Sequence, residues 1–497
     1  VDGKEMLDSL ERGNLFVIPL DDRRQWYRYH HLFADVLGAH LADEQPGQLP
    51  LLHQRASEWY EEQKMPSAAI HHAISAGNFE RAAALAELAW PEWDGSYQSI
   101  AWLGWLEALP REIIRARPAL CVAHAWANLN AGSLEAADAW LRDAERWLDS
   151  AGGIDVAKVS DMIVIDEAQA GSLPASIVTA RAYHAQAIGD TEGTITYCRR
   201  ILEHAAEEEY DQGSALALLG LAYWTNGYLV EAFQTLNRGL EMNPADIIVG
   251  AFVGADLQAT LGDLYGALSL LQRARDAASE HQNPIGTEDV YSALCLVHRE
   301  LGDLDAAAQD LAEAKRFGDQ VELPDWRHRW CIANARLLAS RGDFDGALEK
   351  LDEAQHTYVR TPLPDVRPIA AQKARVWLAL GRVDQALAWA RAGGLTPSGE
   401  LSFLHEYEHI TLARLLIGRY NIDAQEAFID EALQLLGRLL DAAEGGSRTS
   451  TVIEILLLQA LAHQAREDAP AALDALRRAL TLAEPLGFVQ IFVDEGR

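Results

Sequence analysis

Positive charge is scarce in this chain of 497 residues. Its 42 Lys and Arg residues stand against 74 Asp and Glu residues, which leaves a formal net charge of −32. A surface this acidic repels phosphate backbones and anionic lipids. We therefore expect this chain to bind neither nucleic acid nor membranes.

Cysteine and long apolar runs are also scarce. The four cysteines lie far apart and form no C-x-x-C pair, which argues against disulfides and zinc and favours buried thiols in a reducing compartment. The longest apolar run, 453–462, is shorter than the roughly 20 residues that a membrane-spanning helix needs. The N-terminus has no apolar signal core, so we expect a cytoplasmic protein. A start at Val1 instead of Met suggests an excised fragment.

One helical-hairpin repeat runs through most of the sequence. Residues 213–244 fit the 34-residue tetratricopeptide pattern, with Gly220 and Ala232 where two antiparallel helices approach and Gly227 at the turn between them. The turn glycine recurs as Gly132, Gly189, Gly262, Gly302, Gly342, Gly381 and Gly418, with small residues seven before and, in nearly every unit, five after it. Further units are predicted around Gly77 and at Ala460 and Ala472.

These repeats predict the fold class. A helical hairpin cannot bury its apolar face alone, so stacked hairpins form an all-α, tetratricopeptide-like solenoid, a right-handed superhelix with a concave inner wall. One long gap between turn glycines contains residues 150–174, whose clustered glycines and final proline predict an inserted loop.

The residues before the repeats predict a helix, a strand, a charged turn, a second strand and a helix. Here NLF-x-x-PLD, YRYHHLF and A-x-x-HA-x-x-AG-x-x-x-x-A resemble the winged-helix junction of the MalT-type family, the large ATP-binding LuxR-type transcription regulators. Towards the other end, EILLLQALAHQA and ALRRALTLAEPLGFVQIFVDEG resemble that family's last repeat and exit segment. The resemblance implies a winged-helix remnant at 1–45, junction helices and an atypical repeat at 46–120, the sensor repeats at 121–485 and an exit segment at 486–497.

The resemblance also implies what this chain lacks. No G-x-x-x-x-G-K-[ST] phosphate loop occurs, so no cofactor is expected here, and ATP is expected in a missing upstream domain. A helix-turn-helix DNA reader is expected downstream. The family's role implies an effector-sensing, non-enzymatic domain that controls self-association of the full-length protein.

Two sequence features could suggest a metal site. HEYEH at 405–409 matches the H-E-x-x-H signature of zinc proteases, with His405 and His409 as ligands, Glu406 as base and Glu426 as third ligand. The first helix of the Gly418 repeat explains the same segment without chemistry. The adjacent pairs His30–His31 and His71–His72 point about 100° apart on a helix, so packing or capping explains them better. We expect no catalytic residue and no metal site.

The inner wall offers the candidate ligand site. In this repeat, residues three and six before the turn glycine face the concave side, and a ligand there is predicted to meet aromatic, basic and acidic groups. The predicted ligand-binding residues are Trp126, Tyr183, Trp224, Asp256, Arg299, Arg336, Arg375, His405 and Glu408. Repeat-to-repeat ion pairs on a solvated wall are the plain alternative for the charged members.

The sequence thus leaves two functions open. In one, a small-molecule effector or a regulatory protein binds the concave wall and shifts the regulator between states. In the other, the chain is a protein-interaction scaffold with no small-molecule ligand. A closed pocket with convergent polar groups would favour the first, and an open groove of one charge sign the second.

Overall fold

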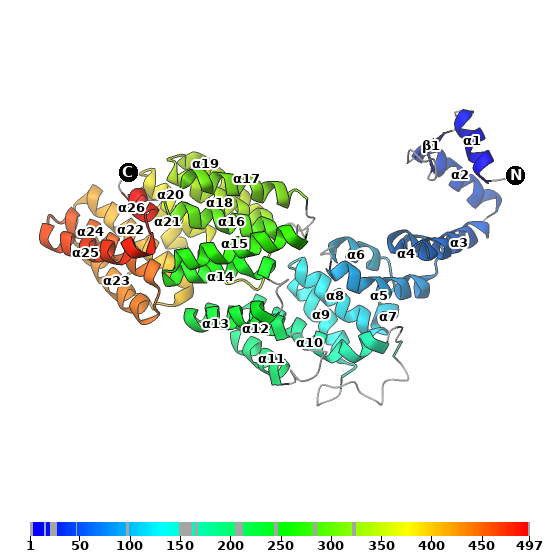
Figure 1. Cartoon of the computed structure of the whole chain (residues 1–497), viewed down its shortest axis with the longest axis horizontal. Helices are drawn as coiled ribbons and strands as arrows, with labels where there is room; N and C mark the ends of the chain where they lie inside the picture. The colour runs from blue at the N-terminus through cyan, green and yellow to red at the C-terminus, as the bar shows by residue number, and fades with distance from the viewer. Residues whose placement is uncertain are drawn as a thin grey trace. The chain divides into compact units, whose positions relative to one another are not determined.

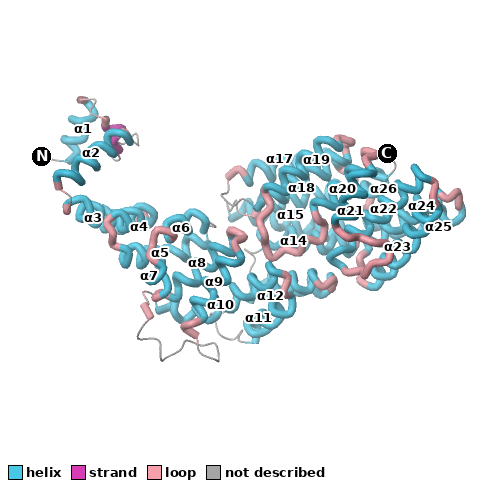
Figure 2. Tube along the Cα trace, turned by 180° about the vertical axis from the view of Figure 1, so that it is seen from behind, coloured by secondary structure: helices cyan, strands magenta, loops and turns pink. Residues whose placement is uncertain are grey.

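The computed structural model describes residues 3–13, 16–19, 27–45, 47–95, 99–148, 162–163, 165, 167–203, 212–242, 247–281, 286–320 and 325–495. These residues are almost entirely helical, with one two-stranded sheet near the N-terminus (Figures 1 and 2). They form two compact units, Val1–Ala123 with Ala157–Glu167, and His124–Val156 with Ala168–Arg497. None of the described helices is long and apolar enough to cross a bilayer.

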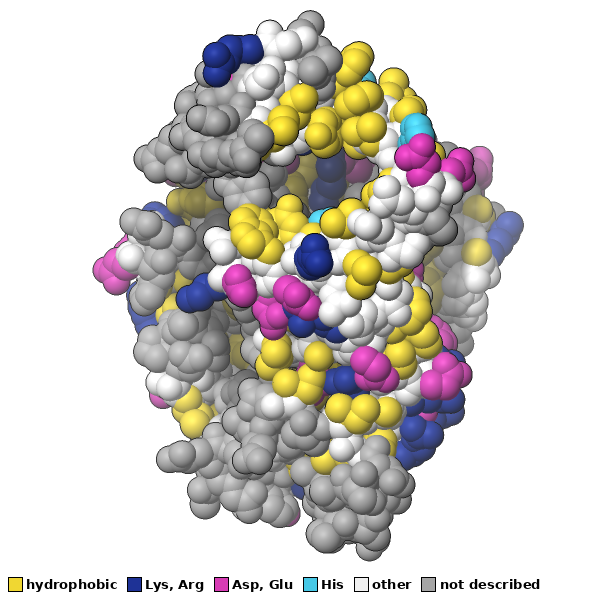
Figure 3. Space-filling view, turned by 90° about the vertical axis from the view of Figure 1, so that its right-hand side faces the viewer, with side chains coloured by type: hydrophobic (Ala, Val, Ile, Leu, Met, Phe, Trp, Pro, Cys, Tyr) yellow, Lys and Arg dark blue, Asp and Glu magenta, His cyan; other side chains and the backbone are white. Residues whose placement is uncertain are grey.

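The N-terminal unit begins with the predicted helix–strand–strand–helix layout. Its elements are α1 (Gly3–Arg12), β1 (Val17–Pro19), β2 (Tyr27–Tyr29) and α2 (His31–Glu44). The strands pair antiparallel with Val17 opposite Tyr29, and Phe33 of α2 stacks on Phe16 with ring centroids 4.9 Å apart. The predicted charged turn lies outside the described residues. Hydrophobic side chains gather on the surface of this part, at the top of Figure 3.

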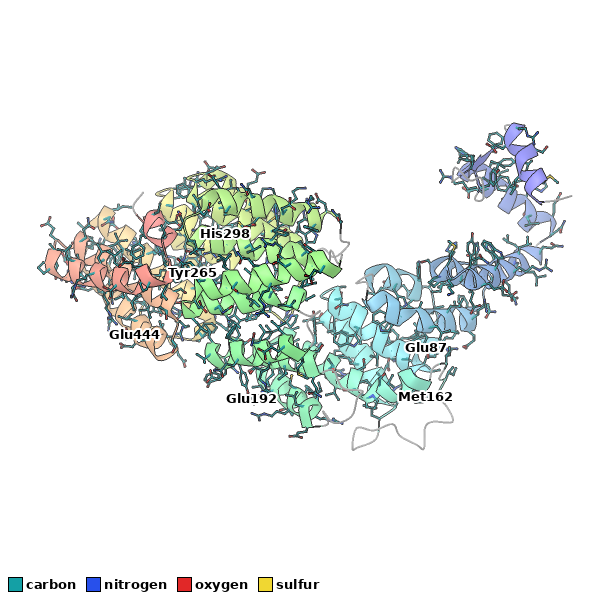
Figure 4. All side chains as sticks on the ribbon, in the orientation of Figure 1. Glu87, Met162, Glu192, Tyr265, His298 and Glu444 are labelled. Atoms are coloured by element: carbon teal, nitrogen blue, oxygen red, sulfur yellow. The ribbon has the colours of Figure 1, made fainter. Side chains whose placement is uncertain are left out.

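The remaining helices of this unit are α3 (Gln48–Glu62), α4 (Pro66–Ser75), α5 (Phe79–Gly95), α6 (Ser99–Leu106) and α7 (Arg111–Arg115). Gly77 joins α4 to α5 with a φ of +71°, as predicted for a turn glycine. Arg117, whose side chain is 5% exposed, pairs with Glu87 at 3.3 Å and Glu80 at 2.9 Å. Glu87 is labelled on α5 in Figure 4. This ion pair ties α5 to the segment that leads into the repeats.

The second unit is built of stacked helical hairpins, which confirms the predicted tetratricopeptide-like solenoid. The pairs are α8 (Pro118–Asn130) with α9 (Leu134–Glu145), α10 (Glu167–Ile188) with α11 (Thr191–Glu203), α12 (Gln212–Thr225) with α13 (Leu229–Met242), α14 (Ile247–Leu261) with α15 (Leu264–His281), α16 (Thr287–Glu300) with α17 (Leu304–Gly318), α18 (Asp325–Ser340) with α19 (Phe344–His356), α20 (Ile369–Ala379) with α21 (Val383–Ala392), α22 (Glu406–Asp423) with α23 (Glu426–Gly445), and α24 (Thr449–Ala465) with α25 (Ala469–Ala483). The 3-10 turns η3 (Phe403–His405) and η4 (Glu484–Leu486) and the short α26 (Gln490–Glu495) complete the unit. Helix α8 continues through residue 123, where the two units meet in sequence.

The predicted packing positions are observed. A Cβ built on Gly220 would lie 3.2 Å from the Ala232 carbonyl oxygen, so the two helices of that hairpin touch closely. Seven of the predicted turn glycines in this unit have φ between +70° and +102°. The small residues on either side are at most 2% exposed, from Ala125 and Ala137 through Ala374 and Ala386. The four cysteines are buried and unpaired, as expected.

Two local predictions were wrong. Gly418 makes no turn, because α22 continues through it with an Arg419–Asp423 pair at 3.7 Å, and the chain turns at Ala424 with φ +50°. The unit predicted at Ala460 and Ala472 is observed as the hairpin of α24 and α25, with the turn at Glu467 and Ala472 half-buried. Of the predicted loop 150–174, residues 150–161 lie outside the described residues. Its final part is helical, because Leu173 and Ala175 are buried on either side of Pro174 within α10.

Two connections bring distant repeats together in the second unit. The segment 357–368 between α19 and α20 reaches the earlier repeats: Arg360 Nε donates to the Ala187 carbonyl oxygen at 3.0 Å, and Gln186 donates to the Pro362 carbonyl oxygen at 3.2 Å. Later in the chain, α24 packs against α14 and α26 against α16. The inner faces of α14 through α24 therefore border a partly open pocket.

Candidate functional site: a charged chamber inside the repeats

This partly open pocket, called the chamber below, has a volume of about 830 Å³. It is lined by the first helices of successive hairpins, α14, α16, α18, α20, α22 and α24, together with α26 and the segment 357–368. Its wall combines aromatic side chains such as Phe252, Phe403 and Tyr407 with carboxylates and arginines. Pockets of this size and mixed lining commonly hold small organic ligands.

Five of the nine predicted wall residues line the chamber: Trp224, Asp256, Arg299, Arg336 and Arg375. The structure does not bring the other four to it. Trp126 and Tyr183 belong to the first two hairpins of this unit, which precede the helices that line the chamber. Trp126 donates to Ser176 Oγ at 3.3 Å, and its ring meets the Tyr183 ring edge-on at 5.6 Å.

His405 and Glu408 do not line the chamber. The repeat pattern aligns them to a turn at Gly418, whereas the chain turns at Ala424, so the wall positions of this hairpin lie further along α22. His405 is 59% exposed, and its Nδ1 lies 2.8 Å from Ser402 Oγ. Glu408 is partly buried beside His405, at 3.9 Å from its Nε2. These two residues therefore lie outside the chamber that five of the other predicted residues line.

The first ion cluster of the chamber centres on Arg299 of α16. Its side chain is 8% exposed and pairs with Glu300 at 2.5 Å and with Asp494 of α26. Its Nε donates to Ser340 Oγ at 2.8 Å. Arg336 of α18 shares Glu300 at 3.0 Å. Burial and the neighbouring Arg299 lower the pKa of Arg336, so two guanidinium groups compete here for one carboxylate of the repeats.

The second cluster centres on Glu454 of α24. This carboxylate accepts from Arg375 at 2.7 Å and from Arg414 at 2.8 Å. Burial opposes its ionisation, but the two arginines outweigh burial and lower the pKa of Glu454 to about 2. Arg414 also pairs with Glu495 of α26, and Arg375 lies over the Tyr407 ring, 3.6 Å from its centroid. Glu454 is therefore ionised whenever the chain is folded near neutral pH.

Two further ion pairs lie in the chamber wall. Arg367, from the segment 357–368, pairs with Asp256 at 2.9 Å and reaches Thr260 Oγ1 at 3.4 Å. Arg329 makes two contacts of 2.6 Å with the carboxylate of Asp289. The ion pairs that the sequence left as the plain alternative therefore exist, and their side chains are partly exposed.

Sequence reasoning missed several of these residues, although a signal for some was present. The lining stripe continues beyond positions three and six to ten and thirteen residues before the turn, which is the spacing of one helix face. Phe252, Arg414, Asp289, Arg329 and Glu454 occupy those deeper positions. Arg367, Asp494 and Glu495 carry no such signal, because they lie outside the repeat pattern.

The zinc-protease alternative does not fit the geometry. His405 precedes α22, Glu406 is held by Arg448 with contacts of 2.6 to 3.1 Å, and His409 Nδ1 lies 2.8 Å from the His405 carbonyl oxygen. Glu426 contacts Tyr420 Oη at 3.3 Å. Within the described ranges no three His, Cys, Asp or Glu side chains are grouped to hold a metal ion.

The paired histidines pack against neighbouring side chains. His72 stacks on Tyr60 with centroids 5.3 Å apart, and its Nδ1 lies 2.8 Å from His53 Nδ1. Burial is the main cause that lowers the pKa of both imidazoles. His30 stands at the N-cap of α2 without a side-chain cap bond, and the side chain of His31 lies outside the described residues.

Comparison with known proteins identifies the family. The model of the MalT-like TPR region matches residues 175–497, which include every chamber residue, and the MalT winged helix domain matches residues 1–49. The chain belongs to the MalT-like family.

Relatives of this MalT-like chain include longer proteins. The chain is 26% identical to the serine/threonine-protein kinase PknK of Mycobacterium tuberculosis (strain CDC 1551 / Oshkosh), over 99% of the chain and 44% of the relative. It is 25% identical to the HTH-type transcriptional regulator MalT of Yersinia pestis (strain Pestoides F), over 99% of the chain and 53% of the relative. The chain thus spans about half the length of these curated relatives.

A solved structure supports the fold alone. The Cut9–Hcn1 hetero-tetramer of APC/C matches with a TM-score of 0.51 at 11% identity, over 100% of this chain and 91% of that one. This likeness places the MalT-like chain among helical-repeat solenoids.

Proposed function

We propose that this MalT-like chain is the effector-sensing and regulatory part of an ATP-dependent bacterial transcription regulator, and that a small-molecule effector binds in the chamber. The observation that carries this proposal is the partly open pocket of about 830 Å³, whose wall joins aromatic rings to charged groups of both signs. An open groove of one charge sign would have favoured a peptide partner.

The remaining roles follow from the family. The chain itself is proposed to be non-catalytic and cytoplasmic, with ATP bound by another domain of the full-length regulator. Effector binding would shift self-association of that protein by the difference in affinity between its two states. Binding of a regulatory protein to the solenoid, without a small-molecule ligand, is the alternative outcome of the test.

A thermal-shift screen of the chain against oligosaccharides, aromatic metabolites and nucleotides tests the proposal. Ligand at about 100 times its Kd should stabilise the folded chain by roughly 2.7 kcal/mol. Trp224→Ala and Arg336→Ala should abolish the shift, because both side chains line the chamber. Trp59→Ala, which removes a 44% exposed tryptophan of the other unit, is the matched control and should leave the shift unchanged.

Two results would contradict the proposal. One is a saturable shift that survives both chamber substitutions. The other is the absence of any shift across all three ligand classes together with capture of a protein partner, which would establish the scaffold alternative.

A further inference from the structure

Helix α26 brings two carboxylates into the chamber from the C-terminal end of the described chain. Its approach is fixed by Phe488, which is 6% exposed in an apolar cluster with Leu264 and Ile453. The Val489 amide donates to the Glu300 carbonyl oxygen at 3.0 Å. This bond places α26 beside α16, the helix that carries Arg299.

The charge balance of the two ion clusters depends on α26. Four guanidinium groups, those of Arg299, Arg336, Arg375 and Arg414, face two carboxylates from the repeats, Glu300 and Glu454. Within these two clusters the repeats alone therefore leave an excess of two positive charges. Asp494 and Glu495 of α26 supply the two missing negative charges, one to Arg299 and one to Arg414.

Arg414 contacts α26 through a terminal nitrogen of its guanidinium group. Its side chain is 18% exposed, and its Nε is buried and has no hydrogen-bond partner among the described residues. Arg299 and Arg414 thus present donors toward the positions that the carboxylates of α26 now fill.

We propose that Arg299 and Arg414 form two anion subsites of the chamber, which take a small dicarboxylate in exchange for Asp494 and Glu495 of α26. Two negative charges are required, because displacing α26 would otherwise leave the four arginines with two uncompensated charges. Carboxylates are the class of choice, because the present occupants are carboxylates. This inference rests on the proposed function, since it names the ligand class of the same chamber.

The exchange has a regulatory consequence. Ligand and α26 compete for the same two arginines, so each lowers the apparent affinity of the other by the same factor. A bound dicarboxylate releases α26 from α16, and the C-terminal segment then reports whether the chamber is occupied.

Isothermal titration with succinate tests the subsites directly. Asp494→Ala/Glu495→Ala vacates both positions, and we expect this double variant to bind succinate at least ten times more tightly than the wild-type chain. Adding Arg299→Ala or Arg414→Ala should remove that gain. The control Asp474→Ala removes an exposed carboxylate paired with Arg477 and should bind succinate as the wild type does.

Three results would overturn the inference: equal succinate affinity in the double variant and the wild type, a gain that persists without the two arginines, or tighter binding of inorganic phosphate than of succinate. A second measurement needs no variant. Succinate should accelerate hydrogen exchange of the amides of 488–495 in the wild-type chain while those of α25 stay unchanged, and equal rates at every concentration would contradict the exchange.

Failure here is distinct from failure of the proposed function. A neutral effector whose thermal shift depends on Trp224 would keep the chamber as the effector site even if succinate binds nowhere.

Discussion

Replacing Glu288 by Gln should stabilise the protein at alkaline pH and leave it nearly unchanged at acid pH. Glu288 is 3% exposed in the first turn of α16, and its Oε2 is buried with no hydrogen-bond partner among the described residues. Its Oε1 accepts from the Gly286 amide at 3.3 Å. Burial and the neighbouring Asp289 raise the pKa of Glu288 from 4.5 to about 7. Gln mimics the protonated carboxyl and keeps the Gly286 bond.

The sign and size follow from proton linkage. The folded chain holds the Glu288 proton between pH 4.5 and 7, whereas the unfolded chain has released it, so stability falls as the pH rises through that window and is constant above it. The raised pKa corresponds to a loss of up to about 3 kcal/mol, at about 1.36 kcal/mol per unit. Glu288→Gln removes this loss.

Urea unfolding at pH 4.5 and pH 8 measures the effect. We expect the difference in unfolding free energy between variant and wild type to grow by about 1 to 3 kcal/mol from the lower to the higher pH. Glu280→Gln, which changes an exposed carboxyl on the preceding helix, is the control and should show no such trend. A variant whose advantage is the same at both pH values would refute the reasoning.

Three further predictions concern the turns and buried ion pairs. Gly227→Ala should destabilise the chain by about 1 to 2 kcal/mol in urea unfolding, because Gly227 has a φ of +83° and a new Cβ would lie 3.0 Å from Phe403 Cβ. Gly437→Ala, inside α23 where a Cβ meets open space, should stabilise the chain by up to about 1 kcal/mol in the same assay. The reverse order of the two variants would contradict this prediction. Arg448→Ala should lower the free energy of thermal unfolding by about 3 to 5 kcal/mol, because it leaves the buried Glu406 carboxylate without its ion-pair partner. Arg477→Ala, at an exposed ion pair, should be neutral in the same thermal unfolding assay. Equal effects of the two variants would be inconsistent with a buried pair. Asp310 raises the pKa of His298, which is labelled in Figure 4. Asp310→Asn should therefore lower the His298 pKa in an NMR titration and destabilise the chain more at pH 6 than at pH 9. An unchanged His298 titration would exclude the pairing.

Most of the fold could be read from the sequence because tetratricopeptide packing is local. Two helices of one hairpin can approach only where small residues face each other, so positions such as Gly220 and Ala232 fix the hairpin without knowledge of distant segments. Gly418 misled the prediction because a glycine can also continue a helix at a cost of about 1 kcal/mol. Local pattern alone cannot decide between these two uses.

In the candidate site, too, some features follow from local sequence and others only from the tertiary structure. The sequence by itself determined which side chains face inward, since helical periodicity places Asp256, Arg299, Arg336 and Arg375 on the inner wall. Only the tertiary structure decided that this wall borders a chamber. The chamber depends on contacts of α26 with Arg299 and of Arg367, in the segment between two hairpins, with Asp256. Arg299 and Asp494 are 195 residues apart, and no repeat spacing relates them. Their contact depends on how the small rotations between many hairpins add up, and no single hairpin specifies that sum.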